Sequence, residues 1–273
     1  MVRDKSAIIA GVARFKLTVE YAGTRYSGWQ KQSNARTVQG ELERAIADAL
    51  ESYEFEFQGS GRTDAGVHAL RQVAHLEAHM GIPLDKLRRR LNDDLPPDIH
   101  VLSIVKAPHR FHARHAAVAR SYLYQVSRRR TAFAKPYVWW VKDPLDLDVM
   151  QAAAAQFSGM HDFQSFSDDD PEDKSTAVLI DDVTIGEEGD LILIRVAGSH
   201  FLWKMVRRMV GVIVEIGRGG LPLAAIEDFL REPSAAPARL TAPASGLFLE
   251  QVFYEGDSRD VPLVSAVPVG AAR

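Results

Sequence analysis

The stretch Gly59-Ser60-Gly61-Arg62-Thr63-Asp64-Ala65-Gly66-Val67-His68 follows the apolar pair Phe55 and Phe57 and precedes a predicted strand over residues 68–79. Its three glycines permit sharp turns and the close approach of a ligand to the backbone. Between them stand a guanidinium, a hydroxyl and a carboxylate, from Arg62, Thr63 and Asp64. The pattern predicts a tight loop that displays Asp64 among small residues, where nothing blocks a substrate.

Two interpretations of this loop remain open from its residues alone. In one, Asp64 caps a backbone turn and Arg62 is solvated, because Asp and Gly are both favourable turn residues. In the other, Asp64 is a candidate catalytic carboxylate, Arg62 lies against a phosphate or in the gap left by a displaced base, and Thr63 fixes the loop by a bond to the backbone. The loop lacks the Gly-Lys-Ser/Thr ending of nucleotide hydrolases, so it is not a phosphate-binding loop of that class.

Strand and helix patterns follow one another along the rest of the chain. Alternating apolar residues predict strands over residues 13–21 and 118–128, and further strands are expected over 99–105, 178–185, 191–196 and 247–254. Helical spacing predicts helices over residues 38–50 after the cap Thr37, over 83–91, over 147–157 and, as the longest, over 200–216. Residues 167–174 and 232–239 are expected to be exposed loops.

This order of elements predicts an α+β fold with two similar halves, mostly antiparallel sheets and helices packed on them. We place the approximate boundary near residue 110. The N-terminal half, residues 1–110, carries the glycine-rich loop, and the C-terminal half, residues 111–273, completes one continuous catalytic unit. The natural place for a site is then the cleft between the halves.

The composition restricts the class of protein. Apolar residues make up 46% and charged residues 25% of the 273 positions, which are ordinary globular values. No apolar run is long enough to span a bilayer, and the first fifteen residues lack the pattern of a secretory signal. The absence of cysteine excludes disulfides, thiolate metal sites and a cysteine nucleophile. These points predict a soluble, cytoplasmic protein.

Charge is segregated along the chain, although the net charge is only −3. Residues 162–190 hold eleven acids and one lysine, whereas residues 99–142 hold nine bases and no acid. Because phosphate binding depends on local potential, the basic stretch predicts a nucleic-acid-binding surface. Its members are Lys106, Arg110, Arg114, Arg120, Arg128, Arg129, Arg130, Lys135 and Lys142.

The sequence GRTDAGVHA, within QGSGRTDAGVHALRQVAH, closely resembles the active-site loop of the tRNA pseudouridine synthase A family. Similar motifs follow in the family's order from about Phe15 to Tyr254. They are YAGTRYSGWQKQ from Tyr21, Leu91-Asn92 with LPPDI from Leu95, FHAR from Phe111 with RSYLY from Arg120, MVR from Met205 through Gly211, and GLFL from Gly246. Ala22 stands where the family commonly has Asp, and residues 176–178 lack its usual arginine, but neither departure touches the loop.

This resemblance implies an RNA-modifying isomerase that converts uridine to pseudouridine in the anticodon stem-loop of tRNA, at positions 38 to 40. It implies that Asp64 is the catalytic carboxylate, that Arg207 pairs with it, and that Tyr122 stacks on the target base. Pairing with Arg207 is expected to lower the pKa of Asp64 and keep it ionised. Substrate contacts are expected from Arg62, Thr63, Arg114, Gly246 and Leu247, and RNA contacts from Trp29, Arg128, Arg129 and Arg130.

The implied reaction breaks an N-glycosidic bond and rejoins the same base through carbon, so neither a cofactor nor a metal is required. Asp64 can attack the sugar or the base, or remove a sugar proton, and the sequence does not choose among these routes. Family members similar to this chain are homodimers, so the expected partners are tRNA and a second copy, with no membrane.

The histidines are not expected to bind a metal. On a strand, His112 would face away from His109 and His115, and no carboxylate lies near them in the sequence. His68 and His75 are predicted to be structural or to contact RNA.

Two other functions compete with an isomerase. A non-catalytic RNA-binding module would use Tyr122, Trp29 and the arginines, and would leave Asp64 as a turn residue. A hydrolase of nucleosides or glycosides would need paired carboxylates, but the loop holds only one acid. The joint presence of Asp64, Tyr122 and Arg207 favours the isomerase.

Overall fold

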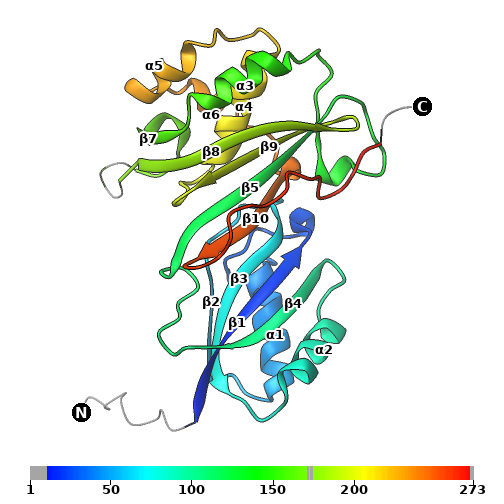
Figure 1. Ribbon diagram of the computed structural model, residues 1–273. Coiled ribbons are helices and arrows are strands. Elements are labelled where there is room, and N and C mark those ends of the chain that lie inside the picture. Colours follow the sequence, from blue (N-terminus) through cyan, green and yellow to red (C-terminus); the bar gives the residue numbers. More distant parts are fainter. Residues whose placement is uncertain (1–10, 171, 173–174, 271–273) are drawn as a thin grey trace.

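The computed structural model describes residues 11–170, 172 and 175–270 (Figure 1). Within this part of the chain, ten strands form one sheet and six α-helices flank it. The strands are β1 (Val12–Tyr21), β2 (Phe55–Gly59), β3 (His68–His79), β4 (Ile99–Ala107), β5 (Ala117–Ser127), β6 (Trp139–Trp140), β7 (Gly159–Asp162), β8 (Ala177–Glu188), β9 (Leu191–Gly198) and β10 (Leu247–Tyr254). The helices are α1 (Val38–Leu50), α2 (Leu84–Asp94), α3 (Leu147–Ala155), α4 (Met205–Gly217), α5 (Ala225–Arg231) and α6 (Ala236–Arg239).

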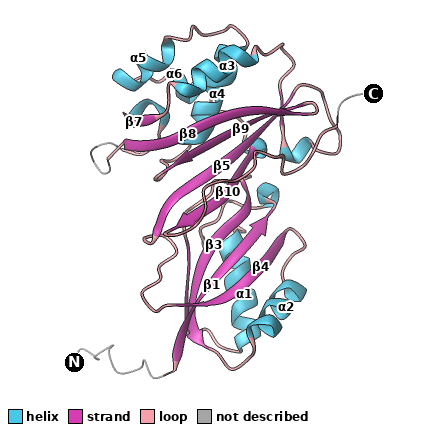
Figure 2. Cartoon of the chain, viewed as in Figure 1, coloured by secondary structure: helices cyan, strands magenta, loops and turns pink. Residues whose placement is uncertain are grey.

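The strands follow the order β4-β1-β3-β10-β5-β9-β8-β7, with β2 added beside β3 and β6 beside β5. Neighbouring strands pair antiparallel except in the short β10–β3 and β5–β6 contacts. The predicted mixed, mostly antiparallel fold is therefore confirmed. Instead of a separate sheet in each half, a single sheet runs through the whole molecule, as Figure 2 shows.

The last strand, β10, lies in the middle of this sheet and joins its two parts, because it inserts between β3 and β5. Phe248 pairs with His68 at the end of the glycine-rich loop, and Leu247 pairs with Tyr124 on β5. The chain thus returns at its end to the place where the loop begins β3, and the first residues of β10 come to lie beside that loop.

Two main groups of buried apolar side chains lie on either side of this junction. One is built from β1, α1, β3, α2 and β4, and the other from β8, β9, α3 and α4. Tyr122 on β5 packs against both groups. The boundary near residue 110 and the similarity of the two halves stay predictions.

The helices form where the sequence places apolar side chains on one face. Thr37 caps α1 as predicted, with its hydroxyl accepting from the Gly40 N–H at 3.2 Å, and Leu42 and Ile46 are fully buried. In Figure 1, α1 and α4 both run behind the strands. Among the described residues, no helix is long and apolar enough to cross a membrane.

Two predicted boundaries in the C-terminal part were wrong. Helix α4 begins at Met205, not at residue 200, because Lys204 has a left-handed conformation (φ 62°) and the Trp203 N–H donates to the Asp169 carboxylate at 2.9 Å. Residues 232–239 are not all loop, since α6 forms within them. Of the loop expected over 167–174, residues 171, 173 and 174 lie outside the described residues.

A third apolar cluster lies where the C-terminal segment crosses the sheet. Leu263, Val267 and Val269 belong to a cluster with Leu123 and Phe248. The buried amide of Gln125 fixes this segment, because its oxygen accepts from the Ala266 N–H at 2.7 Å. The last segment therefore covers apolar side chains of β5 and β10.

Candidate active site

The glycine-rich loop, residues 60–67, connects β2 to β3 and rests on Trp29. A Cβ at Gly59 would lie 2.6 Å from the Trp29 ring, so only glycine permits this packing. The backbone N–H of Trp29 donates to the Thr63 carbonyl at 3.0 Å. Gly28 has a φ of 90°, and a Cβ there would lie 2.5 Å from the same carbonyl oxygen. These contacts fix the position of the loop against Trp29 and the preceding Gly28.

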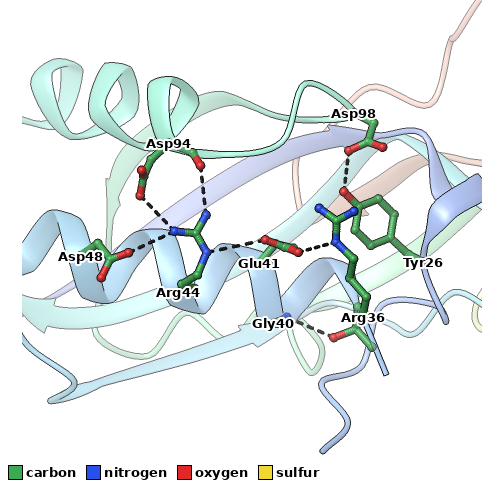
Figure 3. A network of polar contacts seen from close by, with 9 residues as sticks. Tyr26, Arg36, Gly40, Glu41, Arg44, Asp48, Asp94 and Asp98 are labelled. Atoms are coloured by element: carbon green, nitrogen blue, oxygen red, sulfur yellow. Dashed lines mark hydrogen bonds and ion pairs between the residues drawn. The ribbon is translucent and has the colours of Figure 1, made fainter. Parts of the chain in front are cut away.

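A polar network holds the segment that carries Trp29 (Figure 3). The Tyr26 hydroxyl donates to Asp98, and Arg36 pairs with Glu41 on α1 at 2.6 Å. Arg44 joins α1 to the end of α2 through Asp94 at 3.4 Å. The Tyr26 carbonyl in turn accepts from the Gly66 N–H at 3.3 Å, so this network reaches the loop itself.

Asp64 and Arg207 come together from opposite sides of the junction. Arg207 lies in the first turn of α4, and its Nη1 is 3.7 Å from Asp64 Oδ2. The Arg207 Nε donates to the Ala242 carbonyl at 2.7 Å, which fixes the guanidinium. The Asp64 side chain is 29% exposed, so its carboxylate is partly desolvated yet still open to a ligand.

The pKa of Asp64 is raised, not lowered as expected from its pairing. Burial is the largest cause, and it outweighs the opposing effects of Arg207, Lys204 and a side-chain hydrogen bond with Trp203. Asp168 raises the pKa further through its own negative charge. The predicted lowering of the Asp64 pKa took account of the positive charge of Arg207 but not of the cost of removing the carboxylate from water.

Tyr122 lies on β5, close enough to Asp64 to interact with its charge. Its ring meets Phe201 edge-on, with the ring centroids 5.0 Å apart. Burial raises the pKa of Tyr122 to about 12, while the nearby Arg120 lowers it and Asp64 raises it. The hydroxyl is therefore protonated at neutral pH and lies within electrostatic reach of Asp64. The structure thus brings Asp64, Tyr122 and Arg207 together from three distant segments.

The residues expected to line the pocket have different surroundings. Leu247 is 5% exposed, and Gly246 lies so close to Tyr124 that an added Cβ would be 2.6 Å from its ring. The Thr63 hydroxyl bonds to the Tyr21 hydroxyl at 2.8 Å and not to the backbone. Arg62 is exposed, and its Nε donates to Gln30 at 3.1 Å.

Burial contradicts the prediction that Trp29 contacts RNA. Trp29 is 1% exposed and packs against Tyr21 and Phe57, with ring centroids 5.9 and 6.2 Å away. It supports the loop from below and has no surface to offer a ligand. In the motif that begins at Tyr21, Trp29 stands among turn residues. That pattern fits a buried ring as well as an exposed one.

Of the three predicted RNA-binding arginines that follow β5, two have acidic partners within the chain. Arg128 pairs with Glu187, and Arg129 pairs with Asp190 at 2.6 Å. Arg130 lies over the Trp140 ring, 5.8 Å from its centroid. The acidic stretch therefore neutralises part of the basic stretch, and RNA contacts by these three residues stay a prediction.

His109, His112 and His115 do not lie on a strand, so the geometric argument about them was wrong. The rings of His112 and His115 are 4.2 Å apart, and that of His75 is 4.6 Å from His112. His68 and His75 are buried, and burial lowers the pKa of each. In the part of the chain that the structure describes, no cluster of histidine and acidic side chains is arranged to hold a metal ion.

Three residues near the site, Trp203, Lys204 and Asp168, had no role in the sequence-based prediction, and Arg120 entered it only as a member of the basic stretch and of the RSYLY motif. Trp203 and Lys204 precede α4 and act on Asp64, but the helical pattern concealed them in an expected helix. Asp168 pairs with Lys204 at 2.6 Å and also with Arg208. Arg120 lies two residues before Tyr122 on β5, so the two side chains share one face of the strand. The sequence spacing could therefore have predicted that Arg120 lies near the site.

The arrangement is suited to chemistry on a nucleoside. A carboxylate with raised basicity lies next to a fixed guanidinium, a protonated phenol and the apolar side chain of Leu247. Such a carboxylate can act as a base or a nucleophile. An aromatic ring beside it can stack on a base that has left its helix.

Comparisons with known proteins identify the family to which this chain is similar. A family model described as tRNA pseudouridine synthase matches residues 17–115 and 153–255. The chain is 39% identical over 236 residues to tRNA pseudouridine synthase A of Halalkalibacterium halodurans, covering 86% of this chain and 90% of that protein. It is 41% identical over 241 residues to the protein of the same name from Pelobacter propionicus, covering 88% and 98%.

Proposed function

The chain belongs to the tRNA pseudouridine synthase family, and from this membership we propose that it isomerises uridine to pseudouridine in the anticodon stem-loop of tRNA. The proposed targets are positions 38 to 40, Asp64 is the catalytic carboxylate, and no cofactor takes part. The observation that carries the proposal is the Asp64 carboxylate, 3.7 Å from the Arg207 guanidinium and beside Tyr122.

The reaction exchanges one bond for another and moves one proton. The bond between N1 of the base and C1′ of the sugar breaks, and a bond between C5 and C1′ forms. C5 loses a proton and N1 gains one, so no group and no electron is lost. The single carboxylate of Asp64 is sufficient for this exchange, whether it attacks C1′, attacks the base or removes a sugar proton.

The neighbouring residues adjust this carboxylate and hold the base. Arg207 opposes the rise in the pKa of Asp64 that burial causes, and so favours the ionised form. The Tyr122 ring offers a stacking surface, and Leu247 gives the pocket an apolar wall. Arg62, exposed at the rim of the loop, can occupy the gap that the displaced base leaves.

Further parts of the proposal rest on the family resemblance. We expect the protein to act as a homodimer in the cytoplasm, with tRNA lying across both copies. Substrate contacts by Thr63, Arg114 and Gly246 also belong to this proposal. Thr63 acts indirectly, since its hydroxyl is engaged by Tyr21.

The test is to incubate an unmodified tRNA transcript with the purified protein and no added cofactor, and then to analyse the nucleosides. Pseudouridine in the anticodon stem-loop supports the proposal. Unchanged RNA would indicate a binding module, and free uracil would indicate a hydrolase. Asp64→Asn should form no pseudouridine while still binding tRNA, whereas the matched control Asp143→Asn, at an exposed site, should behave as wild type.

A further inference from the structure

Arg120 is a half-buried guanidinium that forms no ion pair with a carboxylate of the described residues. It lies on β5, two residues before Tyr122, so both side chains point to the same face of the sheet. None of the ion pairs formed by the described residues includes Arg120. Burial lowers the pKa of its side chain, and the nearby positive charge of Arg114 lowers it further.

Three backbone carbonyls orient the Arg120 side chain. Its Nη1 donates to the Ser199 carbonyl at 2.9 Å, and its Nη2 donates to the carbonyls of Ser60 and Arg114 at 3.2 and 3.1 Å. Ser60 begins the catalytic loop, and Ser199 begins the segment that leads to α4 and Arg207. Arg120 therefore joins the two segments that bring Asp64 and Arg207 together.

These carbonyls accept hydrogen bonds from the Arg120 guanidinium but do not neutralise its positive charge. A guanidinium has five N–H donors, and the carbonyls use three of them. A partly buried cation without a counter-ion is costly, and a second arginine beside it raises that cost. Arg114 lies close enough to act on the charge of Arg120, and neither forms an ion pair with a described carboxylate. Two such neighbouring arginines match the charge of a phosphate group, and Arg120 keeps two N–H donors for its oxygens.

We propose that Arg120 and Arg114 together form a phosphate subsite that binds the RNA backbone next to the nucleotide stacked on Tyr122. This inference rests on the proposed function and adds the group that receives the backbone. Arg114 is exposed and reaches the phosphate from the solvent side, while Arg120, held by its three carbonyls, receives it from the sheet. Binding the phosphate supplies the missing anion and fixes the sugar over Asp64.

The experiment measures RNA affinity as a function of salt, by fluorescence anisotropy with an anticodon stem-loop RNA. All proteins carry Asp64→Asn, so that no turnover occurs. The variants are Arg114→Gln and Arg120→Gln, and the matched control is Arg88→Gln on α2, at the lower end of Figure 1. Melting curves identify any variant that fails to fold. If Arg120→Gln does not fold, Arg114→Gln still tests the subsite, because Arg114 is exposed.

Each site variant is expected to lower the salt slope by about 0.7, the value for one contact to single-stranded RNA. When the salt is raised from 50 to 200 mM, the affinity of the parent protein should fall by a factor roughly 2.5 times larger than the affinity of such a variant. Arg88→Gln keeps the parent slope. Parent slopes in both Arg114→Gln and Arg120→Gln would overturn the subsite.

A second measurement separates phosphate binding from a purely structural role. An RNA with an uncharged methylphosphonate at the phosphate flanking the target uridine should bind the parent protein less tightly, but should bind Arg114→Gln with little further loss. An equal loss in both proteins would show that the arginines do not contact this phosphate. Failure of the proposed function would appear separately, as absence of pseudouridine in reactions with the intact Asp64 protein.

Discussion

Replacing Arg207 by glutamine removes the cation beside Asp64 and keeps a polar side chain. Burial raises the pKa of Asp64, and Arg207 is the largest opposing influence. Without it, the pKa should rise further. Because the proposed chemistry uses the ionised carboxylate, the loss of activity at acidic pH should begin at a higher pH in Arg207→Gln than in the wild type.

The distance sets the size of this effect. Two unit charges 3.7 Å apart attract by about 1 kcal/mol in bulk water and about 4.5 kcal/mol at an effective dielectric constant of 20. The side chains are 17% and 29% exposed, so solvent screens part of the attraction, and we take about 1–2 kcal/mol. At about 1.36 kcal/mol for each factor of ten, the ratio of ionised to protonated Asp64 falls by roughly 5- to 30-fold.

The assay is single-turnover pseudouridine formation with saturating protein, repeated from acidic to alkaline pH. The deficit of Arg207→Gln should be largest at acidic pH and shrink as the pH rises. Arg218→Gln, at the other end of α4, makes the same change of charge far from Asp64 and should keep the wild-type profile. A deficit that is the same at every pH would refute the electrostatic role of Arg207.

Three further predictions concern stability. Since the pKa of Asp64 is raised by folding, its ionised form costs stability above that pKa, so Asp64→Asn should melt at a higher temperature at neutral pH and lose this advantage in acid. Equal melting temperatures at neutral pH would contradict this. Trp29→Ala should destabilise by about 3–5 kcal/mol in denaturant unfolding, because a cavity opens under the loop, without changing the salt slope of RNA binding. A changed slope with unaltered stability would restore Trp29 as an RNA contact. Ending the chain after Asp260 should lower the unfolding midpoint and increase binding of an apolar dye, because Leu123 and Phe248 lose their cover; an unchanged unfolding curve would count against that packing.

Local structure was largely predictable from the sequence, because it depends on neighbouring residues. The observed bounds of β3 and β10 are those predicted from the sequence. The start of α4 could not be predicted, since it depends on Asp169, which is distant in sequence and binds the Trp203 N–H. The insertion of β10 between β3 and β5 rests on a short parallel contact that leaves no periodic signal.

The candidate site shows the same limit. The glycines and Asp64 indicated an exposed loop, but only the resemblance linked that loop to Tyr122 and Arg207, which lie far along the chain. The sequence also did not separate Trp29, which is buried, from the exposed aromatic rings. Contacts between distant segments decided both outcomes, and composition and spacing do not encode those contacts directly.

The position of Arg207 reconciles two opposing needs of the carboxylate. A carboxylate that acts as a base or a nucleophile gains from burial, because desolvation raises its basicity. Burial alone would also favour the protonated acid, which is inactive in each of the proposed routes. A guanidinium in direct bidentate contact would retain the charge but occupy both oxygens. At 3.7 Å, with its Nε held by the Ala242 carbonyl, Arg207 retains the charge and leaves the carboxylate free to reach the nucleotide.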